Sequence, residues 1–350
     1  MEQKEEAKPV LVTGGSGYIA SWIIKLFLEK GFPVRTTVRN LAQKERVNHL
    51  LEIAEASSGT LTLYEADLLK DGSFSEAMAG CEAVVHTASP FFLYGIKNPR
   101  EQLIEPALQG TRNVLTSAGE NASVRRVVLT SSVVAIYGDA SDIRDTPAGI
   151  FTEKEWNTSS SEKHQPYSYS KMLAEQEAWK MAAEQKQWDL VVLNPGFVLG
   201  PSLTKRKDSF SIDFMISMLN GKYKIGVPDL HFGIVDVRDV AKAHFLATTT
   251  PQASGRHILV AGIKTTLEIA TILRQKFGDK YPLPKMTVPK FLSYLVGPFF
   301  GLKWKFISKN VGIALKFDNS YSQQDLGLEY RPLETTLHDQ AAQIIKDQLI

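Results

Sequence analysis

The sequence predicts an α/β fold in which a doubly wound parallel sheet is followed by a smaller C-terminal lobe. In the first two-thirds of the chain, short apolar runs rich in β-branched residues alternate with segments of helical composition. The runs are apolar on both faces, as parallel strands are when helices cover both sides of their sheet. After Pro195 the alternation becomes irregular, which indicates a smaller unit built on the far edge of the sheet.

Six runs are expected to form the parallel strands, joined by right-handed helical crossovers. They are residues 9–15, 33–39, 61–67, 82–88, 125–132 and 189–195. In the later part of the chain we expect helices near 209–220, 237–249, 265–277 and 333–348, with a short strand at 255–261.

The bulk composition argues against several classes of protein. The 350 residues are 43% hydrophobic and 22% charged, and the net charge is +2, whereas nucleic-acid binding needs a clustered basic surface. The basic run 205–207 lies between turn-like residues and is interpreted as a solvated loop. Cys81 is the only cysteine and the seven histidines are scattered, so we expect neither a disulfide within the chain nor a metal site.

We expect neither a secretion signal nor a membrane-spanning segment. Residues 1–9 are charged and polar, unlike the start of a secreted protein. The apolar stretch 291–302 is too short to span a bilayer and is interrupted by Gly297 and Pro298. We therefore expect a cytoplasmic protein, monomeric or homodimeric, with neither a membrane nor a nucleic-acid partner.

A glycine-rich turn connects the first predicted strand to the first predicted helix. Gly14 and Gly17 allow a sharp turn and a close approach to a pyrophosphate at the helix N-terminus, and Ala20 stands where a third glycine is usual. The position between strand and helix makes this a dinucleotide-binding motif of the Rossmann type. The residues expected to contact the cofactor here are Gly14, Gly15, Ser16, Gly17, Tyr18 and Ile19.

The end of the second strand distinguishes between dinucleotides. An NAD-binding chain carries an acidic residue there, but this chain has Arg39, followed by Lys44 and Arg46. The planar guanidinium of arginine suits a phosphate group, so the pattern favours NADP, with these three residues near its 2′-phosphate. At the end of the third strand we expect Asp67 and Leu68 to contact the adenine.

Residues 166–171, PYSYSK, place two tyrosines near one lysine. Pro166 suits the first position of a helix, and the following residues are strong helix formers. On a helix Tyr167 and Lys171 share a face because they are four residues apart, whereas Tyr169 points away from Lys171. The helical register therefore favours Tyr167 over Tyr169 as the partner of Lys171 in a catalytic dyad.

Nine motifs occur in a familiar order between about residues 9 and 345. They are VTGGSGYIA, TVRN, ADL, VHTASP, VVLTSSVVAIY, YSYSK, NPGFVLGP, VDVRDVAKAH and KFDNSYSQQDLG. Together they resemble the extended short-chain dehydrogenase/reductases, in particular the group of dihydroflavonol reductases, cinnamoyl-CoA reductases and yeast methylglyoxal (aldehyde) reductases. The resemblance implies an NADP-binding Rossmann domain at 1–195 and a substrate-binding lobe at 196–350, with segments returning to the Rossmann sheet.

The resemblance also implies roles for the side chains. Tyr167 would donate a proton to the substrate oxygen, and Lys171 would lower the pKa of Tyr167 and hold the nicotinamide ribose. Ser132 would hydrogen-bond the carbonyl oxygen, and Ser131 is the alternative candidate for this role. Asn113 is either a supporting residue or a structural helix position. Further cofactor contacts are implied for Thr87, Ala88, Ser89, Pro195, Phe197, Val198 and Ser211, besides Tyr167 and Lys171.

The expected substrate is a small molecule with a carbonyl group. Phe91, Phe92 and Tyr94 follow the fourth strand and Phe197 follows the sixth, so they are either core residues or the lining of an aromatic pocket that suits aldehydes and ketones. Reduction by NADPH is the predicted reaction. Three alternatives remain: a sugar-nucleotide epimerase or dehydratase, a 3β-hydroxysteroid dehydrogenase-like oxidase, and an NADP-sensing regulator without catalysis.

Overall fold

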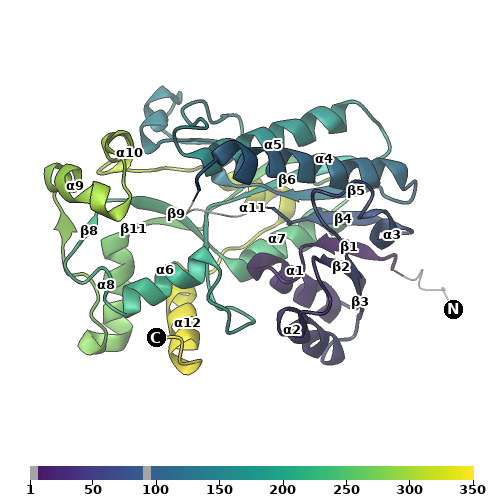
Figure 1. Ribbon diagram of the computed structural model, residues 1–350, viewed down its shortest axis with the longest axis horizontal. Helices are drawn as coiled ribbons and strands as arrows, with labels where there is room; N and C mark the ends of the chain where they lie inside the picture. Colours follow the sequence, from purple (N-terminus) through teal and green to yellow (C-terminus); the bar gives the residue numbers. More distant parts are fainter. Residues whose placement is uncertain (1–6, 90–95) are drawn as a thin grey trace.

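Seven parallel strands form the central sheet of the protein. The computed structural model describes residues 7–89 and 96–350. The strand order is β10-β6-β5-β4-β1-β2-β3, and every neighbouring pair is parallel (Figure 1). The strands are β1 (Val10–Thr13), β2 (Pro33–Val38), β3 (Thr60–Glu65), β4 (Ala83–His86), β5 (Arg126–Thr130), β6 (Asp189–Pro195) and β10 (Gly255–Leu259).

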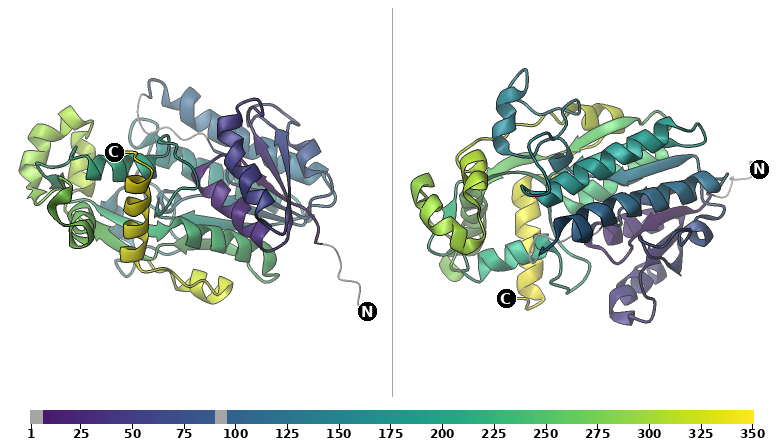
Figure 2. Two further views of the ribbon diagram at one scale, coloured as in Figure 1. Left: turned by 90° about the horizontal axis from the view of Figure 1, so that it is seen from below. Right: turned by 45° about the horizontal axis from the view of Figure 1, so that its top comes forward.

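Helices cover both faces of this sheet, which explains why its strands are apolar on both sides. One layer consists of α1 (Tyr18–Glu29), α2 (Lys44–Glu55) and α7 (Val237–Thr249), and the other of α3 (Ser75–Met78), α4 (Glu105–Glu120) and α5 (Pro166–Ala183). The two layers are visible on opposite sides of the sheet in Figures 1 and 2.

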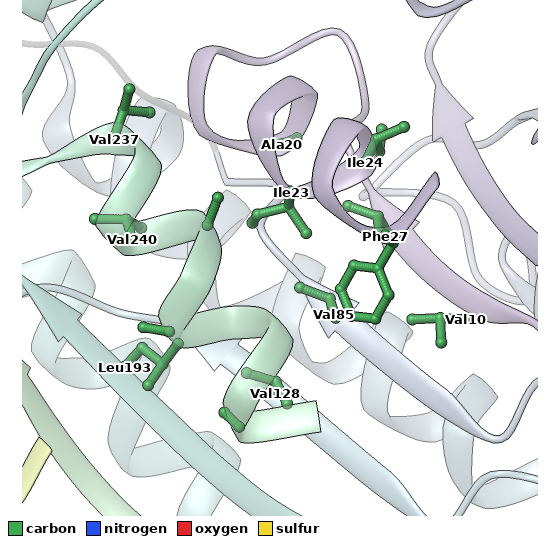
Figure 3. Packing of buried hydrophobic residues seen from close by; sticks show 14 of the residues in the cluster. Val10, Ala20, Ile23, Ile24, Phe27, Val85, Val128, Leu193, Val237 and Val240 are labelled. Carbon is green, nitrogen blue, oxygen red and sulfur yellow. The ribbon is translucent and has the colours of Figure 1, made fainter. Parts of the chain in front are cut away.

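The helix α1 packs against α7 and the sheet through its apolar face, which residues three and four positions apart form. Ile23 and Phe27, four residues apart, are fully buried, as are Val240 of α7 and Val85 and Val128 of the sheet. Figure 3 shows these side chains in one cluster. The cluster holds α1, and with it the glycine-containing loop before α1, against the sheet.

The remaining elements form a smaller unit beside the carboxyl ends of the strands. Its three-stranded sheet has the order β11-β9-β7, with β7 parallel and β11 antiparallel to β9, and a two-stranded sheet pairs β12 with β8. The strands are β7 (Phe197–Leu199), β8 (Val227–Pro228), β9 (His231–Asp236), β11 (Gly262–Thr265) and β12 (Thr287–Val288); the helices are α6 (Phe210–Leu219), α8 (Thr266–Phe277), α9 (Lys290–Val296), α10 (Trp304–Asn310) and α12 (Leu333–Lys346). The exception is α11 (Ser320–Leu326), which packs on the central sheet: Leu326 belongs to the core cluster of α1 and α7, and Asp325 pairs with His257 of β10 at 2.7 Å.

The predicted fold class is confirmed, and each of the six expected strands lies close to its predicted range. The seventh strand, β10, and the helix α7 follow residue 195 in the chain but belong to the parallel sheet and its helical layer. The division into 1–195 and 196–350 stays a prediction.

None of the helices within 7–89 and 96–350 is both long and apolar enough to cross a bilayer. Within the same ranges there is no group of three or more His, Cys, Asp or Glu residues that could hold a metal ion.

The packing of α1 leads to a stability prediction. Ile23→Ala should lower the free energy of unfolding by about 2–5 kcal/mol, because it leaves a cavity between α1, α7 and the sheet. Urea unfolding followed by circular dichroism measures the change. Leu51→Ala, at a leucine of α2 that is 43% exposed, is the control and should cost less than about 1 kcal/mol. Equal losses in the two variants would contradict the assignment of this core.

Candidate functional site

A cavity of about 1180 Å³ lies at the carboxyl ends of the parallel strands, between the central sheet and the smaller unit. Its lining includes residues that follow β1 and β4, the two strands between which the strand order reverses, and this is the usual ligand site of such sheets. Most of the predicted site residues line it: Gly14, Ser16, Gly17, Tyr18, Ile19, Arg39, Arg46, Asp67, Leu68, Thr87, Ala88, Ser89, Ser132, Tyr167, Lys171, Pro195, Phe197, Val198 and Ser211.

The glycine-rich loop forms one wall of the cavity. Gly14 has a φ of 72°, a left-handed conformation that favours glycine, and its carbonyl accepts a hydrogen bond from the Gly17 amide at 2.9 Å. Gly15 does not line the cavity; a Cβ there would come within 2.2 Å of the Thr36 hydroxyl of β2. Gly14 therefore shapes the turn, whereas Gly15 allows the loop to pack on the sheet.

The residues after β2 and β3 line the next part of the cavity. Arg39 is exposed and lines the cavity, as does Arg46 on α2, but Lys44 is an exposed residue at the start of α2 and does not line it. Asp67 accepts from the amide of Leu69 at 2.9 Å. Of the three basic residues predicted at the end of β2, the two arginines face the cavity.

Arg206 is a cavity residue that the sequence analysis missed. Its guanidinium donates to the carbonyl oxygen of Ser16 at 2.9 Å and pairs with Asp208, which also lies 3.7 Å from Arg46. The run 205–207, interpreted as a solvated loop, thus contributes one arginine to the cavity wall. No local pattern signals this contact, because Arg206 and Ser16 are 190 residues apart.

The residues after β4 are held against β1 by hydrogen bonds. The Thr87 hydroxyl donates to the Thr13 carbonyl at 2.5 Å, and the Ala88 amide donates to the Thr13 hydroxyl at 3.1 Å. The Thr13 hydroxyl also lies 2.9 Å from Nδ1 of the buried His86. These bonds position residues 87–89 beside the glycine loop. The predicted substrate residues Phe91, Phe92 and Tyr94 lie outside the described residues.

The predicted helix at PYSYSK is present as α5, and its register separates the two tyrosines. Tyr167 and Lys171 both line the main cavity, with the Lys171 Nζ 6.0 Å from the centre of the Tyr167 ring. Tyr169 lines a different, smaller cavity together with Leu173, four residues later. The helix thus brings Tyr167, and not Tyr169, to the same space as Lys171.

The low polarity around this pair shifts its proton equilibria. Burial raises the pKa of Tyr167, so its phenol stays protonated at neutral pH. Burial lowers the pKa of Lys171 to about 8, while the nearby charge of Glu175 opposes the shift. Burial, and then the charge of Lys171, lower the pKa of His86 to about 3. At neutral pH the site therefore holds a neutral phenol beside an ammonium and a neutral imidazole.

The two serines after β5 have different partners. The Ser131 hydroxyl donates to the buried carboxylate of Glu175, whereas the Ser132 hydroxyl lies 3.4 Å from the Pro195 carbonyl oxygen. Asn194 donates to the same Glu175 carboxylate at 2.7 Å and to the Ser132 carbonyl oxygen at 3.1 Å. Ser131 is thus held by the protein interior, while the Ser132 hydroxyl has two long contacts, to the Pro195 carbonyl oxygen and from the Val134 amide at 3.3 Å, which a ligand could replace.

Glu175 is itself held by a buried ion pair. Arg256 of β10 donates to its other oxygen at 2.6 Å, and the Arg256 guanidinium lies 3.9 Å from the centre of the Trp156 ring. Both charged side chains of the pair are nearly inaccessible. The sequence analysis did not single out either residue, although Glu175 follows Lys171 by one helical turn.

Aromatic side chains form the wall that faces the smaller unit. The Phe197 ring lies 5.5 Å from each of the rings of Phe210 and Phe232, and all three line the cavity. Tyr137 and Phe306 line it as well, and neither was predicted. The wall is therefore mostly apolar on the side away from the glycine loop.

Asn113 lies away from the cavity lining. Its side-chain amide donates to the Leu68 carbonyl oxygen at 2.8 Å, and its side-chain oxygen accepts from Gln109 at 2.8 Å. This arrangement fits the structural alternative, in which Asn113 holds the loop after β3.

Comparisons with known proteins agree with this geometry. The model of the NAD dependent epimerase/dehydratase family matches residues 10–262. Cinnamoyl-CoA reductase 1 of Petunia hybrida is 39% identical over 336 residues, which cover 94% of this chain and 90% of that protein. Tetraketide alpha-pyrone reductase 1 of Arabidopsis thaliana is 34% identical over 342 residues, which cover 96% of this chain and 95% of that protein.

Solved structures give a similar result. Yeast methylglyoxal/isovaleraldehyde reductase Gre2 complexed with NADPH is 27% identical, with a TM-score of 0.80 and coverage of 97% of this chain and 99% of that one. Gre2 in complex with NADPH from Candida albicans is 28% identical, with a TM-score of 0.79 and the same coverage. The chain therefore belongs to the NAD dependent epimerase/dehydratase family, that is, to the extended short-chain dehydrogenase/reductases that its motifs resemble.

Proposed function

We propose that this protein reduces an aldehyde or ketone to an alcohol with NADPH as the reductant. The observation that carries the proposal is that Ser132, Tyr167 and Lys171 line the same cavity as the glycine loop and the arginines after β2. The relatives are in accord, since one is named a cinnamoyl-CoA reductase and one solved aldehyde reductase is complexed with NADPH.

The residues of the cavity fit NADPH in size and charge. The N-terminus of α1 has no acidic residue in its first turn, so its amides suit the pyrophosphate behind Gly14 and Gly17. Arg39 and Arg46 would hold the 2′-phosphate, with Arg206 close to the glycine loop. When bound, NADPH would supply a hydride to the carbonyl carbon of the substrate.

The chain's own residues would manage the charge and the proton on the substrate oxygen. Ser132 would donate a hydrogen bond to the carbonyl oxygen as negative charge develops there. Tyr167, kept protonated by burial that raises its pKa, would donate its proton to that oxygen. Lys171 would stabilise the resulting phenolate and hold the ribose of the cofactor.

The wall of the cavity supports an apolar substrate. Phe197, Phe210 and Phe232 pack together on the side of the smaller unit, where the carbonyl compound would lie. The decisive experiment follows NADPH oxidation by the purified protein with a panel of aldehydes, ketones, acyl-CoA thioesters and sugar nucleotides. Turnover of aldehydes or ketones supports the proposal, whereas turnover of sugar nucleotides alone would overturn it.

The first prediction concerns the proton donor. Tyr167→Phe should lower kcat by about 10²–10⁴ while NADPH binding is kept, since only the hydroxyl is removed. Tyr169→Phe is the matched control on the same helix and should be nearly neutral, because Tyr169 lines a different cavity. Steady-state rates and NADPH fluorescence titrations measure both. Similar losses in the two variants would contradict the assignment of Tyr167.

The second prediction concerns the choice of dinucleotide. Arg39→Ala should raise the KM for NADPH on the order of tenfold or more and leave that for NADH nearly unchanged, because a bond to a charged phosphate is lost. Lys44→Ala is the comparison, and it should have a smaller effect since Lys44 does not line the cavity. Equal changes of KM for the two dinucleotides in Arg39→Ala would refute the phosphate contact.

The third prediction concerns Glu175 as a positioning residue. Lys171 loses its charge as the pH rises through its pKa of about 8, so the rate of reduction should fall above that pH. Glu175 raises the pKa of Lys171; Glu175→Gln should therefore move the fall to lower pH by about one unit. Glu175→Asp keeps the negative charge, so its rate of reduction should depend on pH as that of the unchanged protein does. Thermal unfolding of each variant shows whether it is folded, and an unchanged profile in folded Glu175→Gln would exclude this role.

A further inference from the structure

The end of the smaller unit carries an exposed apolar surface, which we call the apolar patch. It comprises Met286, Phe291, Leu295, Val296, Phe299 and Trp304, with exposed fractions of 56%, 67%, 66%, 43%, 88% and 67%. These residues belong to α9, α10 and the segments that flank α9. In Figures 1 and 2, α9 and α10 lie together at one end of the molecule, away from α2 and β3. So many large apolar side chains in one exposed place indicate an interaction site.

The helix α9 is turned with its large apolar side outward. Within α9 the buried residue is the small Ser293, and the small Gly297 directly after the helix is also buried, while Phe291 and Leu295 are exposed. An amphipathic helix of a globular protein shows the opposite arrangement, with its large apolar residues against the core. The orientation of α9 is therefore unfavourable in water unless another apolar surface covers its exposed side chains.

Contacts within this region fix the patch in place. The indole nitrogen of Trp304 donates to the Tyr294 carbonyl oxygen at 3.0 Å, which satisfies its one polar group. Lys290 at the start of α9 donates to the carbonyl oxygens of Ser308 and Val311 at 3.0 and 2.8 Å. These bonds join α9 to α10 and to the residue after it, so the exposed rings belong to one ordered surface.

The same segment has an unusual charge. Residues 280–317 contain seven lysines and no Asp, Glu or Arg, whereas the whole chain has a net charge of +2. The segment therefore carries +7 and the rest of the chain −5. Lys303 and Lys305 flank Trp304 and are exposed, as is Lys309, whereas the exposed Lys285 pairs with Asp279 at 3.0 Å. The lysines beside the apolar patch that have no carboxylate in their own stretch of sequence are thus mainly those around Trp304, since Asp279 and Asp318 lie just outside residues 280–317.

We propose that the apolar patch docks on an anionic lipid surface. Apolar and aromatic side chains flanked by lysines are the composition that binds the boundary between headgroups and acyl chains. The phenylalanines and Trp304 would enter that boundary, and the lysines would contact the acidic headgroups. Such docking needs no spanning helix, but it revises the expectation that the protein has no membrane partner.

A second copy of the chain fits the patch less well. A two-fold symmetric contact brings the same surface of each copy together, so two segments of +7 would face each other. The helix α10 also connects the patch with the cavity, since it exposes Trp304 to solvent and contributes Phe306 to the cavity lining. A docked lipid surface would lie one helix away from the space proposed for an apolar substrate.

Flotation of the purified full-length protein with lipid vesicles tests the proposal. Vesicles of phosphatidylcholine with added phosphatidylserine should bind at least about tenfold more protein than phosphatidylcholine alone, and high salt should abolish the difference. The double variant Phe291→Ser/Phe299→Ser should lose binding to both, and Lys303→Gln/Lys305→Gln should lose the preference for phosphatidylserine. Leu51→Ser, at an exposed leucine of α2, is the matched control and should bind as the unchanged protein does.

Several results would overturn the proposal. They are an absence of binding, equal binding to the two kinds of vesicle, or equal losses in Leu51→Ser and the patch variants. Sedimentation without lipid measures the oligomeric state and so tests whether a second copy covers the patch. A dimer that dissociates in Phe291→Ser/Phe299→Ser would assign the patch to a second copy. Thermal unfolding of each variant, compared with that of the unchanged protein, ensures that a lost interaction is not a lost fold.

Discussion

The buried carboxylate of Glu175 is the interaction on which the rest of the site depends. One of its oxygens accepts from Arg256 of β10, and the other accepts from Ser131 after β5 and Asn194 of β6. An unpaired charge in the interior is strongly unfavourable, so the Glu175 carboxylate needs these partners to remain buried. Loss of one member of such a pair typically costs about 3–5 kcal/mol. Together these three contacts of Glu175 tie α5 to β10, to β6 and to the residue that follows β5.

This arrangement links structure and chemistry along one helix. Tyr167, Lys171 and Glu175 follow one another at intervals of four residues on α5, so they share a face. The face passes from the cavity, where Tyr167 lies, to the interior, where Glu175 meets Arg256. Burial keeps the phenol protonated by raising its pKa, and the charge of Glu175 limits the fall of the Lys171 pKa. The anchor of the fold is thereby also part of the electrostatics of the proposed site.

The cavity and the apolar patch differ in chemistry. Around the glycine loop, arginines and backbone amides line a cavity suited to a phosphorylated cofactor. At the end of the smaller unit, α9 and α10 combine exposed aromatic and aliphatic side chains with lysines. Because the net charge of the whole chain is only +2, its overall composition reveals neither of these local features. Their separation would let cofactor binding and surface docking occur without competition.

The sequence by itself determined the parallel sheet, the glycine turn before α1 and the shared face of Tyr167 and Lys171. Each depends on residues within one strand, turn or helix, where geometry follows from local spacing. Only the tertiary structure decided that Arg206 meets Ser16, that Ser131 is held by Glu175, and that α9 turns its apolar side outward. Periodicity shows which residues share a face of a helix, but what that face meets depends on segments far away in the chain.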